Sequence, residues 1–375
     1  MRVLYVLNSF PKLSETFVLN EIVELKNRNI DVEILALKDP HEAVINHDVI
    51  EFDLLDATRY FLPSQSSNLR FPYFLSPGFH AMLLSSFYNY RASHSLTHMI
   101  RLSYYSYHYR NIDLIHAHFA FDAAIIAMQM SKLLQKPFTF TAHAYELFNK
   151  NYHSKARLNL LAASARRIFT PSEFNKKYII TETNTPEDKI EIIRATISLE
   201  KFRESKSRQA KGKKIRILGV GRLVEKKGFE YIIRAMKIVT ARHETVELAI
   251  IGEGKLKNEL VQLSLDLGLD SKIKFLGARS NEECIRELSN SDIAVLPCVV
   301  AENGDMDVCP LSLQEAMAME IPVVSTRIGS IPELIEDGKE GVLVPERDEK
   351  ALAEAILGLI ENPALRNEMG RNGRV

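Results

Sequence analysis

The sequence predicts an α/β protein with two doubly wound parallel sheets, one in each half of the chain. Short apolar runs alternate with amphipathic segments through both halves, which is the pattern of strands and crossover helices. The stretch 203–214 between the halves has no aromatic or branched apolar residue and is predicted to be a linker. At 375 residues the chain is long enough for two domains. We therefore expect domains at 1–202 and 215–375, with a ligand cleft between the carboxyl ends of their sheets.

Each element of the first half follows from local patterning. Strands are predicted where a short apolar run lies between helical segments, namely at Val3–Leu7, Asp31–Leu37, Leu114–His118, Phe138–Thr141, Arg167–Thr170 and Ile190–Ile193. Helices are predicted where the apolar residues have a helical spacing, namely at Ser14–Arg28, Asp122–Leu134, 156–163 and Ser172–Thr181. An irregular insertion separates the second and third strands.

The second half repeats the alternation. Its predicted strands are Ile215–Val220, Val246–Ile251, Ile273–Leu276, Ile293–Leu296, Val323–Ser325 and Val342–Val344. Helices are expected between these strands, and the last predicted helix is Glu349–Ile360.

Composition narrows the class of protein. The formal net charge is zero, which argues against a general nucleic-acid-binding protein. No apolar run is long enough for a signal peptide or a membrane span. The three cysteines, Cys284, Cys298 and Cys309, are odd in number and fit a reducing compartment better than a disulfide framework. A cytoplasmic location is therefore expected.

The stretch 303–319 carries the clearest sign of a ligand site. Asp307 lies in a loop, Pro310 is expected to open a helix, and Glu315 falls on a largely apolar face of that helix. A buried carboxylate costs several kcal/mol unless a partner satisfies it, so a partner is implied. The free amides of the helix start, around Cys309 to Ser312, form a cradle for an anion. Such a site suits a ligand that has both hydroxyls and phosphates.

A second pattern follows the first predicted strand of the second half. Glycines at 219, 221 and 228 allow a tight turn, and Arg222 and Lys227 place two cations at the mouth of the sheet. A dinucleotide fingerprint is excluded because the third glycine of its spacing is absent. Ordinary surface charge remains the alternative for this stretch taken alone.

Together these patterns resemble the family 4 retaining glycosyltransferases, which have the GT-B fold of two facing Rossmann-like domains. The family's Glu-Gly-x-Pro and Glu-Ala-Met-Ala segments correspond to 307–310, Asp-Val-Cys-Pro, and 315–318, Glu-Ala-Met-Ala. Its diphosphate pattern, Gly-Arg-x4-Lys-Gly, corresponds to 221–228. Asp307 and Val308 depart from the family's Glu and Gly. The likeness extends to polysaccharide-building members such as the colanic acid glycosyltransferases.

The resemblance implies a reaction and a set of roles. A sugar would pass from a UDP- or GDP-linked donor to a glycan or lipid-linked acceptor in surface polysaccharide synthesis, without a cofactor or an obligatory metal. Arg222 and Lys227 would stabilise the leaving diphosphate, and Asp307 would hold the donor sugar. Glu315 would bind the ribose hydroxyls. The other donor-binding residues implied are Gly221, Ala278, Arg279, Val308, Cys309, Pro310, Leu311 and Ser312.

In the first half, His143 ends a predicted strand and matches the family's histidine near the donor sugar. His116 and His118, which alternate across the preceding strand, are interpreted as structural. The loop Ser14, Glu15 and Thr16 resembles a Ser-Glu-Thr-Phe loop that faces the donor phosphates and the acceptor in polysaccharide-building members. Ser14 is also expected to cap the following helix. The family's C-terminal helix that returns to the first domain is expected to be shortened or missing.

Three alternatives stay open. Asp305 and Asp307 form an Asp-x-Asp that could hold a metal ion in another transferase fold. A nucleotide-sugar 2-epimerase would share the two-domain scaffold. A catalytically silent donor-binding protein would account for the departures at Asp307 and Val308.

Residues 59–110 differ from the rest of the chain. They contain five arginines, no lysine, no acidic residue and thirteen aromatic residues. Amphipathic rings together with arginines suit an anionic membrane surface, which would place the protein at the inner face of the membrane. The alternative is a helical insertion that packs its aromatic residues inward.

Overall fold

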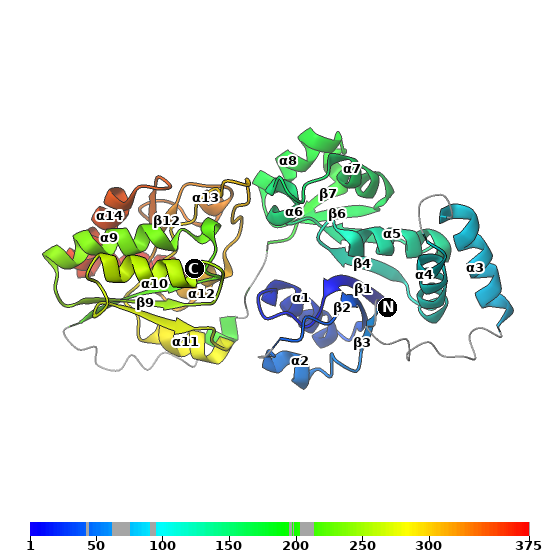
Figure 1. Cartoon of the computed structure of the whole chain (residues 1–375), viewed down its shortest axis with the longest axis horizontal. Coiled ribbons are helices and arrows are strands. Elements are labelled where there is room, and N and C mark those ends of the chain that lie inside the picture. Colours follow the sequence, from blue (N-terminus) through cyan, green and yellow to red (C-terminus); the bar gives the residue numbers. More distant parts are fainter. Residues whose placement is uncertain are drawn as a thin grey trace. The chain divides into compact units, whose positions relative to one another are not determined.

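The computed structural model describes residues 1–42, 45–61, 76–90, 95–194, 197, 199–202 and 214–374. The chain forms two compact units, shown in Figure 1. Unit 1 comprises Met1–Leu147, His153–Pro171 and Asn175–Ile193, and unit 2 comprises Phe148–Tyr152, Ser172–Phe174 and Arg194–Val375. Most of the predicted linker, 203–213, lies outside the described residues.

Unit 1 is built on a parallel sheet with the strand order β3-β2-β1-β4-β5-β6-β7. Its strands are β1 Arg2–Ser9, β2 Asp31–Lys38, β3 Thr58–Tyr60, β4 Leu114–His118, β5 Phe138–Thr141, β6 Arg167–Thr170 and β7 Ile190–Ile192. The α-helices between them are α1 Thr16–Asn27, α2 His47–Glu51, α3 Pro77–Tyr90, α4 Leu96–His108, α5 Asp122–Leu134, α6 Ala144–Phe148, α7 Lys155–Ser164 and α8 Glu173–Thr183. The strand order reverses between β1 and β4, which is where such sheets place ligands.

Unit 2 is built on a second parallel sheet with the order β10-β9-β8-β11-β12-β13. Its strands are β8 Ile215–Val220, β9 Val246–Ile251, β10 Ile273–Gly277, β11 Ile293–Val295, β12 Val323–Thr326 and β13 Gly341–Val344. Its α-helices are α9 Phe229–Arg242, α10 Lys257–Asp266, α11 Asn281–Ser289, α12 Leu311–Ala318, α13 Ile331–Leu334, α14 Glu349–Glu361 and α15 Pro363–Asn372. Here the strand order reverses between β8 and β11.

The predicted fold class, two parallel-sheet α/β domains, is confirmed. Every strand predicted from the sequence is present, with ends within two residues of the predicted ones. The agreement has a simple cause: a parallel sheet buried on both faces needs near-continuous runs of branched apolar residues, and such runs are visible in the sequence. In β9, for example, five of the six residues are buried.

Two helix predictions need correction. Ser14 does not cap α1, because the helix begins at Thr16 and Glu15 occupies the cap position without a side-chain cap. Lys12 explains the change: its carbonyl accepts the N–H of Glu15 at 3.1 Å and its ammonium pairs with the Glu15 carboxylate at 2.6 Å. The second correction concerns the other end of the chain, where Glu349–Ile360 was predicted to be the last helix. A further helix, α15, follows it and packs against α12 and α14 within unit 2.

The insertion at 59–110 packs most of its described aromatic residues inward. The buried rings belong to Phe61, Phe79, Tyr104, Tyr105 and Tyr109. For these residues the prediction of an interfacial surface is wrong, because they form the contact between α3, α4 and the sheet edge. Exposed apolar side chains remain on α3, and Arg70 and Arg91 lie outside the described residues. Among the described helices, none has both the length and the apolar character that a bilayer crossing requires.

Candidate active site

The loop after β8 brings two lysines to the carboxyl end of the unit 2 sheet. Residues Glu225–Lys227 form one short 3-10 turn, which ends at Gly228 with φ +64°. A Cβ atom on Gly228 would lie 1.9 Å from the carbonyl oxygen of Pro297, so only glycine lets this loop pack against the chain that follows β11. The lysines are thereby held against the segment that carries Asp305 and Asp307.

Lys226, Lys227, Asp305 and Asp307 form a buried charge cluster. The Lys226 ammonium lies 3.0 Å from an oxygen of Asp305 and 3.4 Å from an oxygen of Asp307. Lys227 forms an ion pair with the other oxygen of Asp307, and the Cys298 thiol lies 3.7 Å from that oxygen. The structure therefore brings the predicted pair Asp307 and Lys227 together, and it adds Lys226, to which the sequence analysis gave no role.

The pKa values of the cluster follow from burial and pairing. Burial alone would lower the pKa of Lys227, but the Asp307 carboxylate outweighs burial and raises it. Burial acts in the opposite sense on Asp307, and the two lysines outweigh it and hold the pKa of that carboxyl well below its usual range. Burial raises the pKa of Asp305, with Lys226 opposing. The pair Asp307 and Lys227 is therefore ionised at neutral pH.

The same contacts bear on the Asp-x-Asp alternative. The ammonium of Lys226 binds both Asp305 and Asp307, so a cation already occupies the position between the two carboxylates. A metal ion there would have to displace a buried lysine from both partners, which is costly because the lysine would be left unpaired.

Arg222 differs from its neighbours in being exposed. Its side chain forms no hydrogen bond or ion pair within the part of the chain that the structure describes. Its charge nevertheless acts on Asp307, where it contributes to the lowered pKa. Arg222 is thus a cation beside the cluster that can bind an incoming anion without losing a protein partner.

Helix α12 starts next to this cluster. Pro310 occupies its cap position and supplies no side-chain hydrogen bond, so the first amides of the helix are available to a ligand. The preceding Val308 is buried, its carbonyl oxygen accepts a hydrogen bond from the Ser330 hydroxyl, and its φ is negative. The loop has therefore formed around valine without the positive φ that glycine would permit. Leu311 and Ser312, in the first turn, are half-buried.

Glu315 lies one turn further along α12. It is half-buried and has no hydrogen-bond or ion-pair partner among the described residues. Burial raises the pKa of Glu315 to about 7. The sequence predicted that the Glu315 carboxylate has a partner, and no described residue supplies one. This is the state expected of a carboxylate that binds a ligand.

The predicted base-binding residues follow β10. Ala278 is exposed, and Arg279 lies 3.9 Å from Glu283. Burial raises the pKa of the Cys284 thiol to about 12; Glu315 adds to the rise and Arg279 opposes it. Arg279 and Glu315 are thus close enough to act on one thiol. Cys309 accepts a hydrogen bond from the Gln314 amide at 3.1 Å, and the Gly221 backbone N–H bonds to the carbonyl of Ile251 at 3.0 Å.

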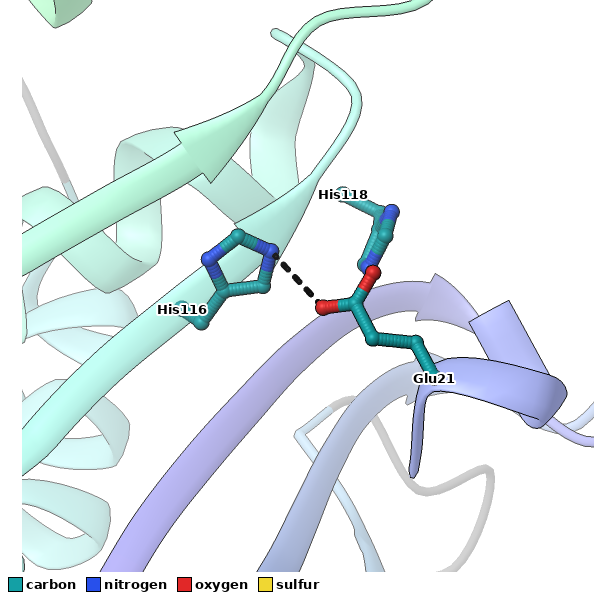
Figure 2. Close-up of side chains that lie close together, drawn as sticks. All are labelled: Glu21, His116 and His118. Carbon is teal, nitrogen blue, oxygen red and sulfur yellow. Dashed lines mark ion pairs between the residues drawn. The ribbon is translucent and has the colours of Figure 1, made fainter. Parts of the chain in front are cut away.

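Unit 1 contains a separate cluster around His143. Figure 2 shows Glu21 of α1 facing His116 and His118 of β4. The Glu21 oxygens lie 3.8 Å from Nε2 of His116 and 3.5 Å from Nε2 of His118. Nδ1 of His118 lies 3.1 Å from Nε2 of His143. The interpretation that the two strand histidines alternate across β4 is wrong: residues two apart share one face of a strand.

Burial governs the protonation of this cluster. It lowers the pKa of His116 to about 3 and that of His143 well below its usual value. For Glu21, burial opposes ionisation, but His118, His116 and the Tyr5 hydroxyl outweigh it and hold the pKa below its usual range. His143 is therefore a neutral imidazole.

Glu146 fixes the backbone next to His143. Its Oε1 accepts the N–H of His143 at 2.7 Å and the N–H of Ala120 at 3.0 Å, which joins the loops after β5 and β4. Burial raises the pKa of Glu146 to about 8. The ring centroids of Phe17, Phe119 and His118 lie 4.7, 4.5 and 5.4 Å from that of His143, so three rings hold the imidazole.

The loop Ser14, Glu15 and Thr16 lies at the start of α1. Glu15 and Thr16 line a depression of about 410 Å³ that is open to solvent, together with residues of β1 and of the start of α2. Within the described residues, this loop forms no hydrogen bond to His143. The contact of the loop with donor phosphates remains a prediction.

Comparison with known proteins decides the family. The sequence profile of Glycosyltransferase Family 4 matches residues 14–201, and that of Glycosyl transferases group 1 matches residues 200–375. The chain belongs to glycosyltransferase family 4. The resemblance inferred from the motifs is thereby confirmed, and the protein is a glycosyltransferase.

Several relatives of this glycosyltransferase are named for polysaccharide synthesis. It is 31% identical to the amylovoran biosynthesis glycosyltransferase AmsK of Erwinia amylovora, over 97% of this chain and 92% of that one. It is 27% identical to WcaL of Escherichia coli, named as a candidate colanic acid biosynthesis glycosyltransferase, over 95% and 90% of the two chains. Among solved structures, Anabaena HepE in complex with UDP has a TM-score of 0.75 and 17% identity, with 100% and 94% covered. These relatives give the epimerase alternative no support.

The sequence analysis missed Lys226, Glu21 and His118 as site residues. A signal existed for the histidines. Residues two apart share one face of a strand, so His116 and His118 lie on the same face of β4. Strand β4 is the neighbour of β5, which ends just before His143. Glu21 gave no comparable signal, since only the packing of α1 on the sheet brings it to the histidines.

Proposed function

We propose that this glycosyltransferase transfers a sugar, with retention of configuration, from a UDP- or GDP-linked donor to a glycan or lipid-linked acceptor in surface polysaccharide synthesis. One observation carries the proposal: unit 2 presents an exposed arginine in the loop after β8, an uncapped start of α12 and an unpartnered carboxylate one turn further along that helix. These groups match a diphosphate and a ribose. The naming of AmsK for amylovoran biosynthesis and the UDP bound to HepE support the substrate class.

Each group has a role in the proposed reaction. Negative charge develops on the leaving diphosphate as the glycosidic bond breaks, and Arg222 and Lys227 are cations placed in advance to stabilise it. Asp307 holds Lys227 in position and can accept a hydrogen bond from the donor sugar. Glu315 accepts from the ribose hydroxyls. No metal ion is assigned to the leaving group, because these cations supply the charge.

Unit 1 supplies the remaining proposed groups. His143 is a neutral imidazole held on three sides, so it can form a directed hydrogen bond with a sugar hydroxyl. The loop Ser14, Glu15 and Thr16 is proposed to bind the acceptor. A cytoplasmic location at the inner face of the membrane would give access to a lipid-linked acceptor.

The test is a thermal-shift panel of nucleoside diphosphates and their sugars, followed by a transfer assay with the stabilising donor. A ligand at a hundred times its Kd should add about 2.7 kcal/mol to the free energy of unfolding. Arg222→Ala should lower turnover about a hundredfold or more. The matched control is Arg234→Ala, since Arg234 is also exposed and lies on α9 of the same unit.

The outcomes separate the alternatives. Transfer that survives EDTA supports the proposal, and its abolition would restore the metal alternative at Asp305 and Asp307. A new sugar product formed without acceptor would indicate an epimerase. Stabilisation by a donor without transfer to any glycan or lipid-linked acceptor would indicate a silent binding protein.

A further inference from the structure

A continuous chain of polar contacts leads from Glu21 to His143. The carboxylate lies 3.5 Å from Nε2 of His118, and Nδ1 of the same ring lies 3.1 Å from Nε2 of His143. His118 is 1% exposed, and its Nε2 has no hydrogen-bond partner of good geometry within the described residues. Water is therefore excluded from the middle of the chain, and each proton position depends on its neighbour.

The carboxylate determines which nitrogen of His118 carries the proton. A lone pair on Nε2 would face the negative charge of Glu21, so Nε2 is the protonated nitrogen. With its proton on Nε2, the His118 ring presents Nδ1 to His143 as an acceptor.

The next proton position follows. Because Nδ1 of His118 accepts, Nε2 of His143 donates the 3.1 Å hydrogen bond. A neutral imidazole has one proton, so Nδ1 of His143 carries a lone pair. That nitrogen has no partner among the described residues.

Tyr5 orients the carboxylate of Glu21. Its hydroxyl donates to Oε1 of Glu21 at 2.6 Å, and Tyr5 itself is buried. This bond leaves the second oxygen of Glu21 facing His118. The carboxylate is thus oriented by one buried group and acts on another.

A metal ion is the rival explanation, because Glu21, His116 and His118 have ligand atoms within 4.8 Å of one another. However, both nitrogens of His116 already have partners: Nδ1 lies 2.8 Å from the Thr139 hydroxyl and Nε2 lies 3.2 Å from the Thr141 hydroxyl. With Tyr5 bonded to Oε1 as well, too few ligand atoms are left for a metal centre.

We propose that Glu21 is a positioning residue that acts through His118 to select the tautomer of His143, so that Nδ1 of His143 accepts a hydrogen bond from a substrate hydroxyl. The inference rests on the proposed function for the substrate, and not for the tautomer itself. The tautomer belongs to the ligand-free protein and can be measured without turnover.

The test uses Glu21→Gln, which keeps the size of the side chain. Tyr5 donates to the amide oxygen, so the amide N–H faces Nε2 of His118 and reverses both tautomers. Two-bond ¹H–¹⁵N spectra of histidine-labelled protein, assigned with His143→Asn, report the protonated nitrogen. We expect the proton on Nε2 of His143 in the wild type and on Nδ1 in Glu21→Gln. The control is Glu24→Gln, since Glu24 lies on the same helix and pairs with Arg28 at the surface.

An activity measurement completes the test. Loss of one hydrogen bond to the substrate should lower kcat about tenfold in Glu21→Gln, with the donor KM nearly unchanged. A wild-type proton on Nδ1 of His143, or a tautomer that Glu21→Gln does not change, would overturn the proposal. So would one equivalent of zinc in the purified protein that His116→Ala removes. If the tautomer of His143 switches but the protein uses no sugar donor, the proposed function is wrong and the role of Glu21 in selecting the tautomer stands.

Discussion

At the scale of single residues, Asp307 shows how this glycosyltransferase departs from its family pattern. The shorter side chain does not leave the position empty: the carboxylate contacts Lys226 at 3.4 Å and is paired with Lys227. Val308 beside it is buried in an ordinary backbone conformation. The loop has therefore been rebuilt around aspartate and valine, which favours an active site over a silent one.

Asp307→Asn should separate catalysis from binding. The amide keeps the shape but loses the charge that holds Lys227, so turnover should fall about a hundredfold. Affinity for the nucleoside diphosphate should stay within tenfold, because Arg222, Lys227 and Glu315 remain. Steady-state kinetics and titration calorimetry check the two quantities.

The matched control is Asp305→Asn, because Asp305 contacts Lys226 and not Lys227. It should change turnover much less than Asp307→Asn. Wild-type turnover in Asp307→Asn would contradict the assigned role and favour the silent-binder alternative.

The positions of single residues were predictable where a motif spans a loop and a helix start, as at Arg222 and Glu315. The spacing alone puts these side chains at a strand mouth and on a helix face. Glu21 could not be predicted in this way, because it reaches His118 only through the packing of α1, nearly a hundred positions away in the chain. Contacts of this kind depend on tertiary structure and leave no local pattern.

At the scale of elements, α12 makes the clearest case of a helix adapted to a ligand. Its start lacks a side-chain cap and its Glu315 lacks a partner, although both cost stability in the free protein. A ligand that supplies a phosphate at the start and hydroxyls one turn later satisfies both. In the proposed function, the sugar donor supplies the partners that the free helix lacks.

We expect Glu315 to make donor binding depend on pH. Its pKa in the folded protein is about 7, above the ordinary value of 4.5, so the folded state keeps a proton that the unfolded chain releases. Stability therefore falls as pH rises from about 4.5 to about 7. Ribose hydroxyls bind the ionised form, so donor affinity should rise about tenfold from pH 6 to pH 8.

Calorimetry at several pH values, with the wild type and Glu315→Gln in parallel, measures this effect. The variant should bind more weakly and lack the rise, and it corrects for titration of the diphosphate itself. It should also be more stable than the wild type above pH 7 without ligand. Parallel pH profiles in the two proteins would exclude Glu315 as the titrating group.

Strands were more predictable than helix ends. A buried parallel strand needs a continuous apolar run, whereas the start of α1 depends on an ion pair between Lys12 and Glu15. For α15 a signal was present and was not used: Asn362 accepts the N–H of Leu365 at 3.1 Å and Pro363 follows at the first helical position.

At the scale of the whole molecule, the chain forms two units that have separate sheets and separate hydrophobic cores. The predicted diphosphate site lies in unit 2, and the histidine cluster lies in unit 1. The sequence predicted the two parallel sheets because each half repeats the same alternation of strands and helices. It could not predict which aromatic residues of 59–110 face outward, because that depends on how α3 and α4 pack together.

We predict that one face of helix α3 contacts a membrane surface. Leu84, Phe87 and Tyr88 are exposed by 71%, 44% and 82%, and their spacing puts them on one face of the helix. The helix has no Asp, Glu, Lys or Arg. An apolar face of this kind suits insertion at the level of the lipid headgroups.

Replacement of Leu84, Phe87 and Tyr88 by Gln should release the protein from vesicles. Each buried apolar side chain contributes about 1.5–3 kcal/mol, so vesicle affinity should fall about a hundredfold or more even though these side chains are partly covered. Co-sedimentation with phosphatidylglycerol and phosphatidylcholine vesicles checks this. The control is Leu265→Gln, because Leu265 is 50% exposed on α10 of unit 2.

Binding should also weaken with salt if the arginines of 59–110 contact lipid phosphates, because exposed charges are screened. Equal sedimentation of the triple variant and the wild type, or dimers that only the wild type forms in light scattering, would assign the α3 face to something other than lipid.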